Sequence, residues 1–229
     1  DWQHSELQVR QATYFDLVEL GYSNLDIAAA LVKNDLKLYK GFDELAGIAL
    51  ENEGSAIQWA EYLSSVPDSF QYILNTSNQI VGNFSFLSIS SDQETAFKEG
   101  KLSESLFNPA ETRDLFCAGD DHILFLLNLS LNDEYSTPRN NTLLRKMFLS
   151  QLLLFAEEDI LFRKIIVNVF KASHEAFYKQ WGFSFVKEHV HSGRIYELEL
   201  KPYPDVLYNQ LNKNRHLKDV NERLKEIYG

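Results

Sequence analysis

The segment 164–185 constrains the fold most, because it combines a strand, a helix, a tight turn and a second strand. Residues 164–170 are mostly β-branched and apolar, which predicts a strand. Ser173 is a typical N-cap residue for the helix that follows, which we expect to carry His174 to Gln180. Gly182 stands where a helix ends in a left-handed residue, and an extended pattern resumes after it.

The rest of the chain predicts further strands and helices around this segment. The strand-like runs are 7–13, 70–74, 80–89, 122–131 and 194–200. Apolar residues at helical spacing predict two or three helices in 24–66, one helix in 140–157 and helical structure in 205–229. Thr13 with Asp16 marks one helix start, and Ser136 or Thr137 before Pro138 marks another. The order of elements predicts a mixed α/β sheet with helices on both faces.

Residues 90–121 interrupt this pattern with a polar stretch that is long for a bare loop. We expect short helices near 93–99 and 109–116. An insertion of this kind often carries substrate specificity, because it lies over a site without disturbing the core. The sequence leaves open the alternative that this insertion is a surface segment with no functional role.

We expect a single domain over 1–202 that contains this insertion, followed by a helical extension over 203–229. In the extension, Leu217, Val220, Leu224 and Ile227 recur every three or four residues and form one apolar face. This face is predicted to dock onto the chain's own domain. A contact with a second copy in a homodimer is the alternative reading.

Composition excludes several classes of function. The formal net charge of −11 argues against nucleic acid as a partner, which requires clustered Lys and Arg. No run of uncharged apolar residues is long enough for a membrane span, and the first residues do not read as a signal peptide. The single cysteine, Cys117, forms no internal disulfide and no cysteine metal cluster, so we expect a cytoplasmic protein without a metal.

The sequence AFYKQWGF at 176–183 resembles the xFYxxxGF signature near the C-terminal end of the GNAT superfamily of N-acetyltransferases. The resemblance implies a mostly antiparallel central sheet with one splayed parallel strand pair and helices on both faces. It further implies an acyl-CoA-dependent N-acetyltransferase, with acetyl-CoA or another acyl-CoA as co-substrate. The implied acceptor is a primary amine of a small molecule or a protein.

By position, the splayed strands of the resemblance would be 122–131 and 164–170. Backbone groups around Leu129, Ser130 and Leu131 would then hold the pantetheine arm and polarise the thioester carbonyl. The phosphates would lie at the start of the next helix, where the resemblance implies contacts with Arg139, Asn140, Asn141, Thr142, Leu143 and Leu144. Ser173 falls where the family often has an asparagine that contacts the cofactor, although a plain N-cap role explains it as well.

The chain departs from the family's pattern in this phosphate loop. With Arg139 aligned to the first residue of the family's Arg/Gln-x-x-Gly-x-Gly/Ala motif, Thr142 and Leu144 stand where the glycines belong. No glycine occurs between Gly119 and Gly182. Glycine lets backbone approach a phosphate closely, so phosphate contacts are expected to be weaker or differently placed.

Tyr178 occupies the position of the tyrosine that in many family members protonates the departing CoA thiolate. A phenol suits this task, because its pKa lies close to that of a thiol. The alternative is a purely structural ring at a helix–strand junction. The sequence assigns no general base: Asn128, Ser130 and Asn168 in the predicted strands are not bases, and candidates near strand ends are His122, Glu134, Glu188, His189 and His191.

Two functions therefore remain open on the sequence. The first is an N-acyltransferase in which Tyr178 is the acid. The second is a GNAT-fold module that has lost its phosphate glycines and binds a ligand or a protein without catalysis.

Overall fold

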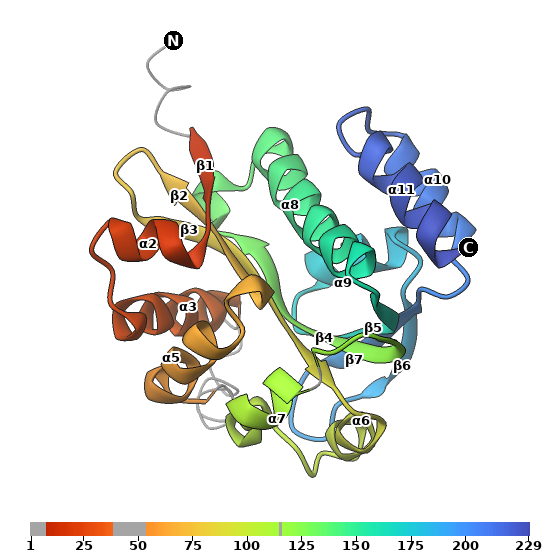
Figure 1. Ribbon diagram of the computed structural model, residues 1–229, viewed down its shortest axis with the longest axis horizontal. Helices are drawn as coiled ribbons and strands as arrows, with labels where there is room; N and C mark the ends of the chain where they lie inside the picture. Colours follow the sequence, from red (N-terminus) through yellow and green to blue (C-terminus); the bar gives the residue numbers. More distant parts are fainter. Residues whose placement is uncertain (1–7, 39–53, 115) are drawn as a thin grey trace.

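The computed structural model describes residues 8–38, 54–114 and 116–229 (Figure 1). The middle of the predicted helical region 24–66 and the first residue of the predicted strand 7–13 lie outside the described residues. No described helix has the length and apolar character that crossing a membrane requires.

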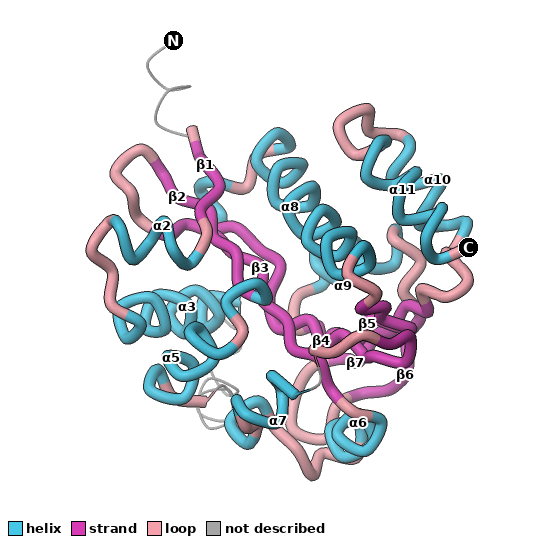
Figure 2. The backbone as a smooth tube through the Cα atoms, in the orientation of Figure 1, coloured by secondary structure: helices cyan, strands magenta, loops and turns pink. Residues whose placement is uncertain are grey.

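A seven-stranded sheet crosses the protein in the order β1-β2-β3-β4-β5-β7-β6 (Figure 2). Its strands are β1 (Val9–Ala12), β2 (Phe70–Asn75), β3 (Ile80–Ile89), β4 (Gly119–Leu131), β5 (Ile160–Val169), β6 (Ser184–Glu188) and β7 (Arg194–Glu199). Among the described strands, only β4 and β5 pair in parallel, and the other neighbouring pairs are antiparallel. The predicted mixed, mostly antiparallel sheet with one parallel pair is confirmed.

Helices cover both faces of this sheet, as predicted (Figure 1). The described helices are α2 (Tyr14–Glu19), α3 (Asn24–Leu38), α5 (Ala56–Ser65), α6 (Ser91–Lys98), α7 (Pro109–Asp114), α8 (Pro138–Glu157), α9 (Ala172–Gln180), α10 (Asp205–Asn212) and α11 (Lys218–Tyr228). The described residues also include three short 3₁₀ helices, η1 (Pro67–Ser69), η2 (Glu104–Leu106) and η3 (Asp133–Tyr135).

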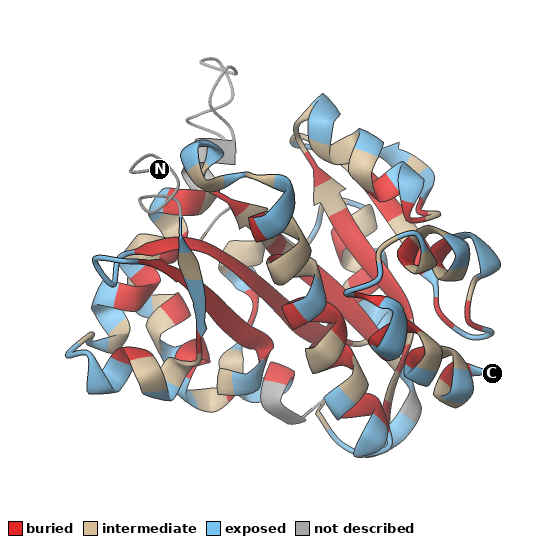
Figure 3. Cartoon of the chain, turned by 90° about the horizontal axis from the view of Figure 1, so that it is seen from above, coloured by how far each residue is buried: buried red, intermediate tan, exposed pale blue. Residues whose placement is uncertain are grey.

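Two apolar cores form on the two faces, so the strands between them are largely buried (Figure 3). One core packs α8 and the C-terminal helices against the sheet, with Phe148 and Leu224 among its fully buried residues. The other packs α2, α3 and α5 against the opposite face, through side chains such as Leu17 and Tyr62. The apolar face of α11 therefore docks onto the chain itself.

The N-terminus of α8 follows the sequence signal. Thr137 has extended backbone and accepts a hydrogen bond from the Asn140 N–H at 3.2 Å, and Pro138 occupies the first turn. The N-cap expected at Ser173 is wrong. Helix α9 begins two residues earlier, at Ala172 instead of His174, and its N-cap is Lys171, which makes no side-chain capping bond. Ser173 therefore lies inside the first turn.

The C-terminus of α9 ends as the sequence predicts. Gly182 has a φ of 91°, a left-handed conformation that favours glycine. Phe183 N–H donates to the carbonyl of Tyr178 at 3.1 Å, and Gly182 N–H donates to that of Lys179 at 3.0 Å. These two bonds form a Schellman motif. The motif fixes the end of the helix that carries Tyr178 and directs the chain into β6.

The insertion 90–121 contains α6, η2 and α7, and a buried ionic cluster ties it to the sheet. Glu94 on α6 lies 2.6 Å from Lys164 of β5 and 2.7 Å from Lys98. Lys98 also contacts Glu197 of β7 at 2.8 Å. The side chains of Glu94 and Lys164 are only 8% and 9% exposed. Burial raises the pKa of Glu94, but the hydrogen bonds from Lys164 and Lys98 outweigh it and hold the pKa below its ordinary value.

Removal of the Glu94 charge should destabilise the protein. In Glu94→Gln, the buried Lys164 loses its closest counter-charge, so we expect the free energy of unfolding to fall by about 3 kcal/mol. The wild-type contribution is present above the ordinary glutamate pKa of 4.5 and is lost as the pH falls through the lower folded-state value. Urea unfolding of both proteins at several pH values measures the difference.

Glu99→Gln on the same segment is the matched control, because Glu99 pairs with exposed Lys101 at the surface. This variant should leave the free energy of unfolding almost unchanged, because solvent screens the exposed pair. Equal stability of Glu94→Gln and wild type at neutral pH would contradict the role of the cluster.

Candidate functional site

The parallel strands β4 and β5 separate part-way along their length. They pair from Gly119 opposite Ile160 as far as Leu126 opposite Val167. Beyond that point each strand keeps only its outer neighbour: Leu131 pairs with Gly82 of β3, and Val169 pairs with Arg194 of β7. The facing backbone edges therefore border a gap, as the splayed pair of the resemblance predicts.

A β-bulge in β4 marks the start of this gap. Ser85 of β3 pairs with Asn128 and Phe86 pairs with Leu126, so Leu127 is an extra residue on β4. A bulge bends its strand and increases the local twist. The residues after Leu127 are thus turned away from β5.

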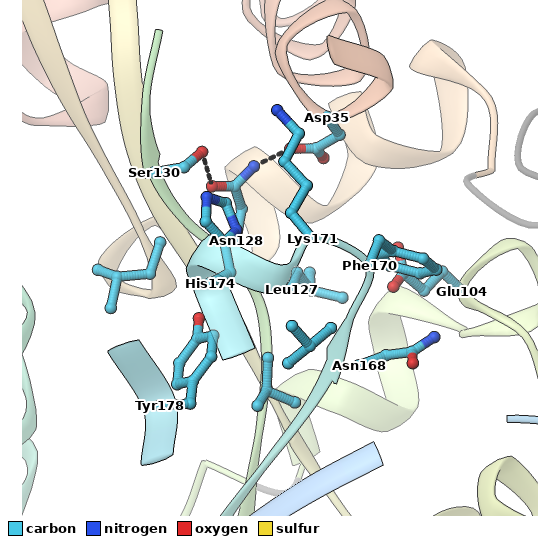
Figure 4. A pocket seen from close by; sticks show the side chains of 13 residues that line it. Asp35, Glu104, Leu127, Asn128, Ser130, Asn168, Phe170, Lys171, His174 and Tyr178 are labelled. Carbon is cyan, nitrogen blue, oxygen red and sulfur yellow. Dashed lines mark hydrogen bonds between the residues drawn. The ribbon is translucent and has the colours of Figure 1, made fainter. Parts of the chain in front are cut away.

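Two cavities lie along the gap and share the lining residues Leu129, Ser130, His174 and Tyr178. The first is narrow, with a volume of about 30 Å³, and lies between β4, β5 and the end of α3 (Figure 4). The second has a volume of about 230 Å³ and lies between β4, α8 and α9. The two cavities are therefore neighbours, with Tyr178 in the wall of both.

Tyr178 stands at the junction of the two cavities. Its side chain is 5% exposed, and its ring packs against Phe177 and Phe183 at centroid distances of 5.0 and 5.1 Å. The hydroxyl points into the first cavity (Figure 4). Burial raises the pKa of Tyr178, so the phenol stays protonated at neutral pH.

The wall of the first cavity opposite Tyr178 carries a chain of polar groups (Figure 4). Ser130 Oγ donates to Asn128 Oδ1 at 2.6 Å, and Asn128 Nδ2 donates to the carboxylate of Asp35 on α3. Glu104, on η2 of the insertion, lines the same cavity. Sequence reasoning missed both carboxylates. The sequence did contain a signal for a polar contact in this cavity, because Asn128 interrupts the apolar run of β4.

His174 lines both cavities from the first turns of α9. Burial lowers the pKa of His174, the nearby charge of Lys171 lowers it further, and Asp133 acts in the opposite direction. The imidazole is therefore neutral at pH 7. His174 therefore lines the gap beside Tyr178 as a neutral polar group.

The second cavity contains a cation that sequence reasoning also missed. Arg145 lines it from the second turn of α8, and its guanidinium carbon lies 4.5 Å from the centroid of the Phe177 ring. Burial lowers the pKa of Arg145, but a guanidinium remains charged at any physiological pH. The same cavity includes the exposed Asp133 on the loop before α8.

The N–H groups of the loop before α8 are already used within the chain. Those of Tyr135, Ser136 and Thr137 donate to backbone carbonyls at 2.8, 3.2 and 2.8 Å. Those of Asn140 and Asn141 donate to Thr137, and Pro138 has no N–H. Backbone N–H groups of this loop are thus largely unavailable to an anion.

The residues predicted to contact the cofactor separate into two groups. Those that line the second cavity are Leu129, Ser130, Leu131, Asn141, Leu144 and Ser173. Those that do not line either cavity are Arg139, Asn140, Thr142 and Leu143. Asn140 is buried and donates to the Tyr135 carbonyl at 3.0 Å, and the Thr142 hydroxyl accepts a hydrogen bond from Asn214 at 3.1 Å. Arg139 is exposed, and Leu143 packs against the core.

The base candidates near strand ends lie away from these two cavities. His122 bonds to the Cys117 carbonyl at 2.7 Å, and Glu188 pairs with Arg194 at 3.1 Å. His189 stacks on Phe97, His191 contacts the Gly100 carbonyl, and Glu134 lines a separate hollow beside α3. Across the described ranges, no three His, Cys, Asp or Glu side chains gather in a way that would hold a metal ion.

Comparison with solved structures identifies the architecture. An acetyltransferase of the GNAT family from Staphylococcus aureus Mu50 superposes with a TM-score of 0.50 at 13% sequence identity, covering 85% of this chain and all of its own. The chain has the GNAT fold. No protein-family model matches its sequence, and no curated protein is significantly similar to it.

Other solved GNAT structures are similar at lower scores. A GNAT-family acetyltransferase from Listeria monocytogenes 4b F2365 has a TM-score of 0.49 at 13% identity, covering 84% of this chain and 94% of its own. Naa20 from Chaetomium thermophilum, solved with a bisubstrate analogue, has a TM-score of 0.41 at 17% identity, covering 92% of this chain and 91% of its own.

Proposed function

We propose that the protein is an acyl-CoA-dependent N-acyltransferase, which moves an acetyl or other acyl group from acyl-CoA to a primary amine of a small molecule or protein. The observation that carries this proposal is the gap between β4 and β5, with the hydroxyl of the buried Tyr178 side chain directed into it. Backbone edges without a ladder partner suit the amides of a pantetheine arm, because buried N–H and C=O groups require partners. The GNAT fold of the chain supports the same chemistry at the level of analogy.

In this reaction, the amine nitrogen attacks the thioester carbonyl carbon, and a C–N bond forms as the C–S bond breaks. The backbone around Leu129–Leu131 orients the pantetheine and polarises the carbonyl oxygen. Tyr178 donates its proton to the departing sulfur, and the raised pKa keeps that proton in place until a thiolate develops. The nitrogen loses a proton as the amide forms, and this proton returns through water to the Tyr178 phenolate, which restores the acid.

The phosphates of the co-substrate require a partner other than the loop backbone. Arg145 meets this need, because it lies in the second cavity, one turn inside α8, and presents several N–H donors to a phosphate. We therefore assign phosphate binding to the Arg145 side chain. In the family, backbone N–H groups beside glycines have this role.

A specific observation favours the second candidate, a binding module without catalysis. Backbone N–H groups within residues 135–141 already donate hydrogen bonds inside the chain, so the loop has few donors left for the phosphates. If acyl-CoA does not bind, the same gap would serve a different ligand. Binding of the co-substrate therefore separates the two candidates.

Isothermal titration calorimetry with acetyl-CoA is the direct test. The wild type should bind, and Arg145→Gln should bind about ten- to a hundredfold more weakly, because it loses charge-assisted hydrogen bonds to phosphate. Lys146→Gln is the matched control, since Lys146 is the exposed neighbour on the same helix, and its affinity should change less than about twofold. No heat of binding at millimolar acetyl-CoA would reject the acyltransferase.

Tyr178→Phe tests the acid. The variant keeps the ring that packs on Phe177 and Phe183, so we expect affinity for acetyl-CoA to be unchanged while kcat falls by about a hundredfold or more. Release of CoA thiol with an amine acceptor measures kcat. Tyr208→Phe on α10, which loses only a hydroxyl contact with Glu222, should keep the wild-type rate. An unchanged rate in Tyr178→Phe would remove Tyr178 from the mechanism.

A further inference from the structure

We infer that His174 is the general base of the proposed acyl transfer, taking the proton that the acceptor nitrogen loses as the C–N bond forms. The inference rests on the proposed function and supplies the group that the sequence did not assign. It concerns the wall that the two cavities share, to which His174 and Tyr178 both belong (Figure 4).

Helix α9 presents the imidazole and the phenol side by side. His174 and Tyr178 are four residues apart in this helix, which runs from Ala172 to Gln180. Side chains at this spacing lie on one face of an α-helix, with their Cβ atoms about 5–6 Å apart. The helix therefore holds a possible base and the proposed acid one turn apart, beside the same gap.

The two cavities bring different reactants to His174 under the proposed function. The second cavity, which contains Arg145, receives the pantetheine arm and the phosphates of the co-substrate. The first cavity has a volume of about 30 Å³, which holds roughly one water-sized group such as an amine nitrogen. Because His174 lines both cavities, its imidazole borders the point where the nitrogen meets the thioester carbon.

The imidazole of His174 is in a state that can accept a proton. Among the described residues, no group is hydrogen-bonded to its ring, so a nitrogen lone pair is open to the ligand. Burial lowers its pKa and the charge of Lys171 lowers it further, whereas Asp133 acts in the opposite direction, so the ring is neutral at pH 7. The other ionisable residues in the walls of the two cavities are Asp35, Glu104, Arg145 and Tyr178.

An imidazole is a strong enough base for this step. It cannot readily deprotonate a free alkylammonium, whose pKa is several units above that of an imidazolium. The nitrogen holds its proton much more weakly once it has bonded to the acyl carbon, because its lone pair becomes part of an amide. His174 therefore acts after the attack has begun, when proton transfer to an imidazole is favourable.

The atoms and protons of the step balance. The acceptor enters as the neutral amine, and its lone pair forms the C–N bond with the thioester carbon. The C–S bond breaks, and the sulfur takes the proton of Tyr178. The nitrogen gives one proton to His174, which passes it through water to the Tyr178 phenolate. Both side chains return to their starting states, and the products are an amide and the CoA thiol.

Replacement of His174 should slow the chemical step and leave binding of the co-substrate intact. With acetyl-CoA and a set of primary alkylamines and arylalkylamines, His174→Ala should lower kcat by about a hundredfold or more, measured by thiol release. Its calorimetric Kd for acetyl-CoA should stay close to that of the wild type. His216→Ala is the matched control, because His216 is exposed on the turn after α10, and it should keep the wild-type rate.

The pH dependence of the rate tests the protonation state. With rates expressed per concentration of neutral amine, the wild-type rate should fall as the pH drops through the pKa of His174, because an imidazolium accepts no proton. This acid limb should lie below 6.5, the ordinary histidine value, since burial lowers the pKa. His174→Ala should lack the limb.

Free imidazole separates a chemical role from a structural one. Added to His174→Ala, it should raise the rate in proportion to its concentration and by at least about tenfold, whereas Tyr178→Phe should not respond. His174→Gln keeps a polar side chain but supplies no base, so it should be as slow as His174→Ala. Thermal unfolding of each variant establishes that it folds.

An unchanged kcat in the two His174 variants, an acid limb that survives in them, or no response of His174→Ala to imidazole would each overturn the inference. If the wild type binds acetyl-CoA and acylates an amine while the His174 variants keep its rate, only the assignment of the base fails. If acetyl-CoA does not bind, or the wild type acylates none of the amines, the proposed function fails and the inference fails with it.

Discussion

The separation of β4 and β5 beyond Leu126 and Val167 is the constraint on which the site depends. A parallel ladder is broken there by the bulge at Leu127, but each strand remains hydrogen-bonded to its outer neighbour. The gap is therefore rigid on both sides, and its two facing edges consist of backbone groups that lack a ladder partner. Every other feature of the site is positioned relative to this gap, including the hydroxyl of Tyr178 and the two cavities that meet at it.

Helix α9 connects the sequence signature to this geometry. Gly182 ends the helix in a Schellman motif, and that ending fixes the angle at which Tyr178 points back into the gap. Local signals of this kind were readable from the sequence, as were the caps at Thr13 and Thr137. The N-cap at Ser173 was not, because the chain leaves β5 in an extended conformation that lasts only to Lys171.

The residues that complete the site were beyond the reach of local patterns. Asp35 and Asn128 are separated by 93 positions and meet only because α3 packs against this face of the sheet. Glu104 reaches the cavity because Gln58 anchors η2. Arg145 lies one turn after the loop where the phosphate contacts were expected, and only the packing of α8 against α9 brings it into the second cavity. Spacing along the chain contains no information on such contacts.

The central claim is that the thioester of acyl-CoA lies between the separated strands. The most direct measurement is a titration of the isotopically labelled protein with acetyl-CoA, followed by assigned backbone amide resonances in NMR spectra. The account predicts that the largest shifts occur at Leu127–Leu131 and in α9, where His174 and Tyr178 line the gap. Shifts confined to the hollow between α3 and the β2–β3 hairpin, with Leu127–Leu131 unmoved, would contradict it.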